Sequence, residues 1–172
     1  MTKVLILIKL TITKKIILSF MMIWITGSGL IIVSSYIYTK SQLFNDIKSR
    51  LTDYAEIGIM GFPADDHSSI NGEEDYLSDH YNLVVEYLRE LKLKCNDVIY
   101  IYTLRRISDN SIVFIGDAET DEETLSYPGD VYDEPSDLIL EIIDGFDEVA
   151  IEKDFVEDEW GNTISAYAPI YN

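Results

Sequence analysis

The feature that most constrains this chain is an uncharged apolar stretch near its N-terminus, from Ile16 to Ile37. These 22 residues, IILSFMMIWITGSGLIIVSSYI, contain no acidic or basic side chain. As a helix they would extend roughly 33 Å at about 1.5 Å per residue, which is enough to cross the hydrocarbon core of a bilayer. We therefore predict a transmembrane helix over residues 16–37.

A cleaved signal peptide is the alternative reading of the same stretch, with Val33-Ser34-Ser35 as a cleavage site. The apolar run is longer than the roughly 7–15 residues of a usual signal-peptide core, which favours an anchor. Lys14 and Lys15 immediately precede it. The positive-inside rule then places residues 1–15 in the cytoplasm and residues 38–172 outside the membrane.

Charge is distributed very unevenly along the chain. The first 40 residues contain five of the 13 basic residues and none of the 31 acidic ones, so residues 41–172 carry 8 − 31 = −23. Phosphate binding needs the opposite sign, so this charge excludes a nucleic-acid surface. An acidic body also repels an anionic membrane surface, which leaves the N-terminus as the membrane-active part.

Two amphipathic helices are predicted after the span. The first continues from the membrane and ends at Gly61-Phe62-Pro63, with a face of Phe44, Ile47, Leu51, Tyr54 and Gly58. It can act as a core-facing helix, as a stalk that carries movement into the bilayer, or as both, and we expect a homodimer through residues 40–60. After a polar stretch, Asn71 and Glu74 have the spacing of a capping box. The second helix then presents Leu77, Tyr81, Val84, Leu88 and Leu91, with Lys92 and Lys94 near its end.

From Val98 the apolar period changes from 3.6 to 2, which predicts strands. Residues 98–105 and 111–118 form a hairpin around the turn 108–110, and residues 136–145 form a short helix that begins near Ser136 or Asp133. Strands follow at 148–152, before the turn Trp160-Gly161-Asn162, and at 163–170. Hairpin-linked strands with helices packed on them predict an α+β fold, with the long N-terminal helix against an antiparallel sheet.

No motif in the chain points to catalysis. The two histidines, His67 and His80, lack the partners that hydrolase or metalloprotease motifs require. A single cysteine, Cys95, forms neither an intrachain disulfide nor a CxxC site, and we expect it to be a small buried apolar residue. We expect no enzymatic role for this chain and no cofactor.

Metal binding is also not expected. Asp65-Asp66-His67 looks like a fragment of a metal site, but we interpret it as a solvated loop. Asp117, Glu119 and Asp121 have the 1-3-5 spacing of a calcium loop, yet Glu122 replaces the glycine at position 6 and Pro128 the glutamate at position 12. The EF-hand interpretation therefore fails.

Tyrosine is abundant, with 12 in 172 residues. Tyr100 and Tyr102 are predicted on one face of the first strand, and Tyr127, Tyr132 and Tyr167 follow in the acidic loop and the last strand. A tyrosine offers an aromatic wall and a hydroxyl, which suits a small-ligand pocket. Arg105 would supply a fixed positive charge, and Asp117 would be its counter-ion or a receptor for a ligand amine. The loop 117–137 is long enough to cover the pocket. The alternative is that these tyrosines face water.

The segments YIYTL, FIGDA, PGDVYDE and DEWGNTISAYAPIY together resemble the Cache-type, PAS-like sensor domains of bacterial and archaeal transmembrane receptors. The resemblance covers residues 38–172. It implies a long helix from the membrane on a central antiparallel sheet, with a lid over a ligand pocket. The implied pocket residues are Tyr100, Tyr102, Arg105, Asp117, Tyr127, Asp130, Tyr132 and Tyr167. It also implies continuation beyond Asn172 into a pairing strand, a second span and an output module such as a histidine kinase, a diguanylate cyclase or a chemoreceptor stalk.

These observations favour the extracytoplasmic ligand-sensing region of a membrane receptor, which would bind an unknown small polar ligand. Two alternatives remain open. One is an anchored protein-interaction domain without a pocket, and the other is an acidic protein secreted after cleavage near Ser35.

Overall fold

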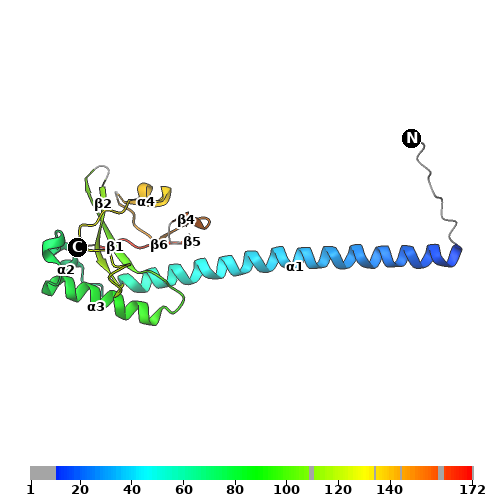
Figure 1. Ribbon diagram of the computed structural model, residues 1–172, viewed down its shortest axis with the longest axis horizontal. Coiled ribbons are helices and arrows are strands. Elements are labelled where there is room, and N and C mark those ends of the chain that lie inside the picture. The colour runs from blue at the N-terminus through cyan, green and yellow to red at the C-terminus, as the bar shows by residue number, and fades with distance from the viewer. Residues whose placement is uncertain (1–10, 109–110, 134, 144, 159–160, 172) are drawn as a thin grey trace. The chain divides into compact units, whose positions relative to one another are not determined.

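The structure is a computed structural model that describes residues 11–171 except 109–110, 134, 144 and 159–160 (Figure 1). The chain divides into two units, residues 1–46 and residues 47–172. The turn residue Trp160 and the turn positions 109–110 lie outside the described residues.

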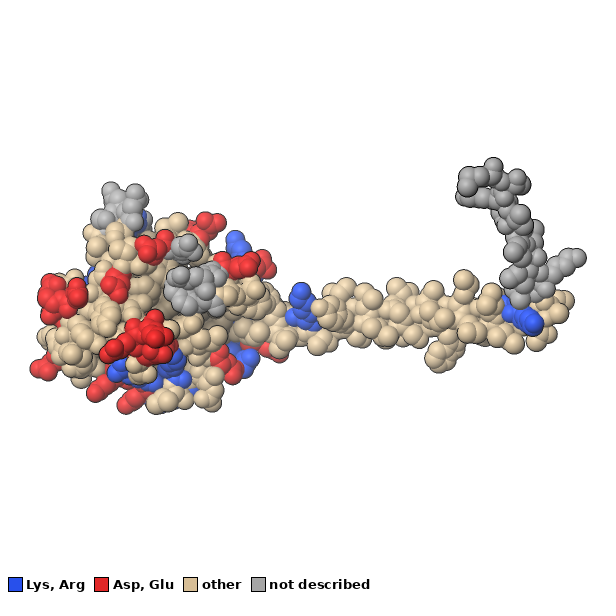
Figure 2. Space-filling model, viewed as in Figure 1, with Lys and Arg blue, Asp and Glu red and all other residues tan. Residues whose placement is uncertain are grey.

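Helix α1 runs from Ile12 to Ile59 and contains the whole predicted span. It is long and apolar enough, by length and composition, to cross a membrane. Its apolar side chains between Ile16 and Ile37 are exposed. Between the lysines at 15 and 40 its surface carries no charge, whereas acidic side chains are frequent on residues 47–172 (Figure 2).

The last turns of α1 belong to the second unit, and they are anchored there by specific contacts. Ile47, Leu51, Tyr54 and Gly58 are partly buried, which confirms the predicted face of this helix. A Cβ added at Gly58 would lie 3.0 Å from Leu91 Cδ2, and the Tyr87 hydroxyl donates to the Met60 carbonyl at 2.7 Å. This end of α1 is therefore packed against α3.

Two predictions on the following segment are wrong. Residues 64–69 form a short helix, α2 (Ala64–Ser69), where a solvated loop was expected. The long helix α3 spans Asp79–Lys94 and begins at an N-cap on Ser78, whose side chain accepts from the Tyr81 amide at 3.1 Å. Asn71 instead donates its amide to Asp75 beside a 3-10 turn, η1 (Glu73–Asp75). Leu77 has φ 64° and is exposed, so it lies outside the helix.

Strands β1 (Tyr102–Ser108) and β2 (Ser111–Asp117) form the antiparallel hairpin that the period of 2 predicts. β1 starts four residues later than expected, and the register shifts between Thr103 and Leu104. The free edge of β2 is covered by residues 129–132. The Gly129 amide donates to the Phe114 carbonyl at 2.8 Å, and the Tyr132 amide donates to the Ile112 carbonyl at 2.8 Å. β2 is thus bonded on both sides and buried along Ile112–Asp117.

The C-terminal part contains a short helix and two small sheets. Helix α4 (Asp137–Ile142) has Ser136 as its N-cap, which is one of the two starts that the sequence predicted. β3 (Ala150–Ile151) pairs with β6 (Ala166–Tyr167), and β4 (Val156–Asp158) pairs with β5 (Gly161–Thr163), all antiparallel. The expected strand 163–170 is therefore divided, and both of its parts have partners within the chain.

The buried core joins α3 to β2. Tyr81, Val84, Val85 and Leu88 pack on Val113 and Ile115, with Ile70 and Ala118 in the same cluster. The α+β class with antiparallel sheets is confirmed, but the described strands form three two-stranded sheets, and a single PAS-like sheet is not confirmed. Within the core, the helix that covers β2 is α3, where the sequence predicted the long N-terminal helix.

Candidate functional site

Aromatic side chains gather where β1, β2 and the segment 129–132 meet. The Tyr102 ring lies 5.2 Å from Phe114 and 6.1 Å from Tyr132, and the Phe114 and Tyr132 rings are 5.4 Å apart, centroid to centroid. The hydroxyls of Tyr102 and Tyr132 are 3.5 Å apart. We call Tyr102, Phe114 and Tyr132 the aromatic cluster. Both contacts of Phe114 are edge-to-face, a geometry that favours fixed ring orientations, whereas the Tyr102 and Tyr132 rings are tilted to each other.

Tyr167 extends the aromatic cluster into a buried polar network. Burial, followed by the proximity of Tyr132, raises the pKa of Tyr167 to about 12, while its hydrogen bonds with Ser136 and Ser165 oppose this shift. Ser136 donates from Oγ to the Glu152 carboxylate, which is 8% exposed, and accepts from the amide of Ile139. One serine therefore both caps α4 and satisfies a buried carboxylate.

A cavity of about 340 Å³ lies beside Tyr132, between the 111–133 region and α4. Its lining is mainly aliphatic, with one basic and one acidic side chain: Arg106, Ser111, Ile112, Val131, Tyr132, Asp133, Pro135, Leu140 and Ile143. Val131 and Leu140 are 53% and 52% exposed, and Asp133 is exposed as well, so apolar and acidic side chains both border the cavity on its solvent side. Of the eight predicted site residues, Tyr132 is the one in this lining.

Arg105 lies away from this cavity. Its guanidinium donates to the carbonyls of His67 and Ile70, at 2.6 Å for Ile70, and so binds the C-terminal end of α2. Burial lowers the pKa of Arg105. The expected pairing with Asp117 is not among the ion pairs of the described residues. A cation on the last carbonyls of a helix has a local stabilising role.

Asp117 is also used locally. It is 3% exposed, and its carboxylate accepts from the amides of Glu119 at 3.0 Å and Ser126 at 2.9 Å, which closes the loop after β2. Burial raises the pKa of Asp117, and the two backbone hydrogen bonds oppose that shift. The carboxylate is therefore the anchor of the 118–126 loop.

The remaining predicted residues are Tyr127, Asp130 and Tyr100, of which the first two share a turn. Asp130 accepts from the Tyr127 amide at 2.7 Å, an arrangement of a turn. The Tyr127 ring contacts Tyr76 at 4.9 Å. Tyr100 precedes β1, with Lys92 Nζ 5.9 Å from its ring centroid. The structure thus brings Tyr102, Tyr132 and Tyr167 together, and it gathers Asp117, Tyr127 and Asp130 separately around the loop after β2.

Arg106 is the site residue that sequence reasoning missed, although the signal was present. Successive side chains of a strand point to opposite faces, so Tyr102 and Arg106 share parity whereas Arg105 does not. The parity argument selects Arg106 as the basic residue on the side of the aromatic cluster. Arg106 pairs in register with Ile112, which also lines the cavity.

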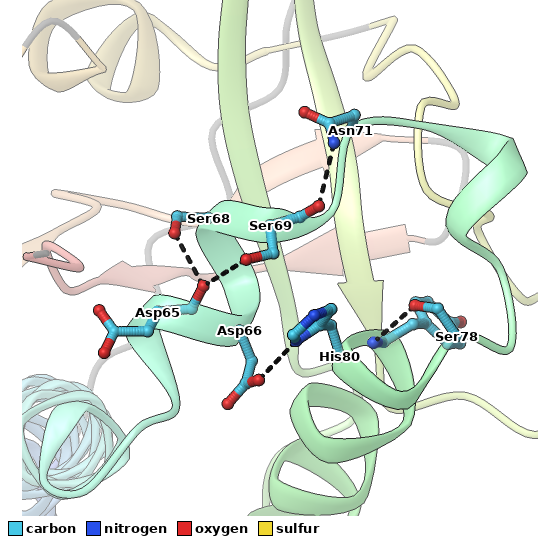
Figure 3. A network of polar contacts seen from close by, with 8 residues as sticks. Asp65, Asp66, Ser68, Ser69, Asn71, Ser78 and His80 are labelled. Carbon is cyan, nitrogen blue, oxygen red and sulfur yellow. Dashed lines mark hydrogen bonds and ion pairs between the residues drawn. The ribbon is translucent and has the colours of Figure 1, made fainter.

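The two histidines lie on the other side of the domain, around α2. His80 Nδ1 is 2.7 Å from Asp66 Oδ1, a contact that joins α3 to α2 (Figure 3). Within the described part of the chain, no group of three or more His, Cys, Asp or Glu is arranged to hold a metal ion. Cys95 is 3% exposed, as predicted for a small buried residue, and burial raises the pKa of its thiol.

Comparison with known proteins gives no relative. The chain matches no protein-family model, no curated protein and no solved structure.

Proposed function

We propose that this chain is the ligand-sensing part of a membrane-anchored receptor, and that its ligand binds in the cavity beside Tyr132. The observation that carries the proposal is the cavity itself, in an α+β unit that follows a helix long and apolar enough to cross a membrane. Its volume of about 340 Å³ falls within the range of small-ligand sites, about 300–1,000 Å³. The resemblance to Cache-type sensors is part of this proposal.

The lining favours a ligand with an apolar body and at least one polar group. Ile112, Leu140 and Ile143 supply aliphatic contact area, which contributes roughly 25 cal/mol for each Å² removed from water. Arg106, Ser111 and Asp133 supply the polar side chains of the lining that orient a ligand. In this proposal the basic residue that contacts the ligand is Arg106, whereas the sequence suggested Arg105.

Orientation in the membrane follows from charge. Lys14 and Lys15 flank the N-terminal end of the apolar part of α1, and residues 41–172 are strongly acidic. The positive-inside rule places the acidic unit outside the cell, with residues 16–37 of α1 as a single-pass anchor. A ligand would then be sensed in the extracytoplasmic space.

A continuous set of contacts offers a route from the cavity to α1. Ile112 of β2 lines the cavity, and the neighbouring Val113 packs on α3. α3 in turn contacts the end of α1 through the Gly58–Leu91 approach and the Tyr87–Met60 hydrogen bond. We propose that ligand binding biases the position of α3, and through it α1, between two states.

A second candidate function is supported by the exposed Val131 and Leu140. Exposed apolar side chains beside a cavity also suit a protein partner. In that case, the cavity would be the recess that accepts a side chain of the partner. The test below separates the two functions because only a sensor responds to small molecules alone.

The test is thermal unfolding of the full chain in nanodiscs against a panel of small carboxylates, amines, amino acids and neutral amphiphiles. A ligand at 100 times its dissociation constant adds about 2.7 kcal/mol of stability. Leu140→Trp should abolish the shift by filling the cavity mouth, while Leu83→Trp on α3 should keep it. The control is matched, since Leu140 is 52% and Leu83 51% exposed. A folded protein that responds to no compound would favour the protein-interaction function.

A further inference from the structure

His67 is a histidine buried without a complete set of partners. Its side chain lies in α2, the residue is 6% exposed, and its ring contacts Phe62 edge-on at 5.6 Å. Nδ1 lies 3.4 Å from Nη2 of Arg105, and the buried Nε2 has no hydrogen-bond partner among the residues that the structure describes. The ring is thus enclosed between an aromatic side chain and a guanidinium.

This geometry selects the neutral ring. Arg105 is a donor only, so Nδ1 accepts and the ring proton lies on Nε2. A second proton on Nδ1 would place an N–H against the guanidinium N–H and a buried charge beside a fixed positive one. In agreement with this, burial and then the Arg105 charge lower the pKa of His67 from 6.5 to about 4.

The other charged groups around α2 do not compensate a charge on His67. Asp66, on the same helix, points to His80 of α3 (Figure 3). Asp65 is exposed, and its backbone carbonyl accepts from the hydroxyls of Ser68 and Ser69. From β1 the charged neighbour is Arg105. Among the described residues, no carboxylate forms an ion pair with His67.

Arg105 also makes α2 dependent on this contact. The helix has six residues, and its C-terminal carbonyls at His67 and Ile70 are both bonded to Arg105. So short a helix is not stable without tertiary contacts. Losing the contacts with Arg105 therefore weakens the attachment of the element that links α1 to α3, which is otherwise held by Ile70 in the core and by the Asp66–His80 contact.

We propose that α2 is an acid-sensitive element, in which acidification of the surrounding solution charges His67, separates it from Arg105 and releases α2 from the domain. Protons would then be a stimulus independent of the ligand cavity. The sign follows from linkage. The released form binds a proton below about pH 6.5 and the closed form only below about pH 4, so closure weakens as pH falls through this window and is fully present above it.

The size of the effect follows from the same two values. At pH 5 the released state gains a factor of 1 + 10^1.5 and the closed state a factor of 1 + 10^−1, whereas at pH 7 the released state gains only 1 + 10^−0.5. The opening equilibrium therefore rises about 20-fold between pH 7 and pH 5. A histidine that keeps its ordinary pKa in the closed form would give no change.

Two measurements on the full chain in nanodiscs test this. The exchange rate of the amides in 64–70 is compared between the wild type and His67→Gln, and this ratio should be about 20-fold higher at pH 5 than at pH 7. Comparison at equal pH removes the intrinsic pH dependence of exchange. Because His80 also contacts α2 through Asp66, the comparison is repeated in a His80→Gln background, where His67→Gln should change the ratio by the same factor. An unchanged ratio would overturn the proposal.

The second measurement does not depend on the stability of a His67 variant. The chain contains two histidines, so ring NMR signals are assigned by recording wild type and His80→Gln. The His67 ring should titrate well below 6.5 in the folded protein. A His67 signal that titrates near 6.5 with protected α2 amides would show that the charged ring is accommodated, and the proposal would be wrong.

Discussion

Gly116 provides the sharpest test of the packing between α3 and β2. A Cβ built at this position would lie 2.9 Å from Val84 Cγ1, and 3.4 Å from both Leu88 Cδ1 and Thr103 Oγ1. Val84 is 0% exposed, and β-branched side chains in helices keep a single χ1 rotamer. The valine methyl therefore cannot rotate away, and α3 must move to admit an alanine.

The expected cost follows from these distances. Overpacking a tight core costs about 1–3 kcal/mol, and the reduced entropy of the unfolded chain on Gly→Ala returns about 0.4–1 kcal/mol. Gly116→Ala should thus destabilise the domain by about 1–2 kcal/mol. Gly58→Ala is the control, because its Cβ meets the flexible end of Leu91 at 3.0 Å inside a helix. There, helix propensity favours alanine by up to about 1 kcal/mol, so the expected change is zero or stabilising.

The assay is denaturant unfolding of the full chain, read by alkylation of the single buried Cys95. Val84→Ala removes the obstructing methyl and should cost about 1.6 kcal/mol from two lost methyl groups at about 0.8 kcal/mol each, plus a cavity term. In the double variant, the new methyl at 116 occupies that space. The double variant should therefore cost at least about 1 kcal/mol less than the sum of the two single substitutions. Additivity within about 0.5 kcal/mol would refute the predicted contact.

Three further predictions concern single contacts. Ser136→Ala removes the cap of α4 and the hydrogen bond to buried Glu152, and should cost about 1–3 kcal/mol in the same unfolding assay. Cys95 should react with iodoacetamide at pH 8 far more slowly in the folded chain than in denaturant, because burial hides the thiol and raises its pKa. Equal rates would contradict the placement of Cys95. Tyr87→Phe removes the bond to the Met60 carbonyl and should cost about 1 kcal/mol, without changing expression in membranes.

Helices with strong apolar periodicity were predictable from the sequence, and their boundaries were less so. The stripe Tyr81, Val84 and Leu88 correctly predicted α3. Its start was wrong because Asn71 and Ser78 both qualify as caps, and Ser78 is selected by the left-handed Leu77 before it. Local sequence does not separate two such candidates.

The missed helix α2 has a different cause. Its sequence, ADDHSS, is polar and too short for any periodicity. The Arg105 guanidinium stabilises it by hydrogen bonds to the carbonyls of Ile70 and His67. Arg105 lies 35 residues after Ile70 and 38 residues after His67 in the chain. Contacts across that separation are set by the tertiary fold and leave no local pattern.

The site was predictable in part for the same reason. Aromatic content predicted Tyr102, Tyr132 and Tyr167 as neighbours, and strand parity contains the information that Arg106 shares their side. Asp117 looked like a ligand receptor because it is a carboxylate at the end of a strand, yet it binds the amides of Glu119 and Ser126. Sequence identifies a charged group, but whether backbone or ligand uses it depends on loop geometry.

The central claim is that the acidic unit lies outside the cell on a membrane anchor, and labelling in intact cells tests it most directly. In a Cys95→Ala background, Asn162→Cys on exposed β5 and Thr2→Cys before the span are treated with a membrane-impermeant maleimide. The account predicts that Asn162→Cys is labelled in intact cells and that Thr2→Cys is labelled only after permeabilisation. The opposite pattern, or recovery of the full-length chain in the soluble fraction, would contradict it.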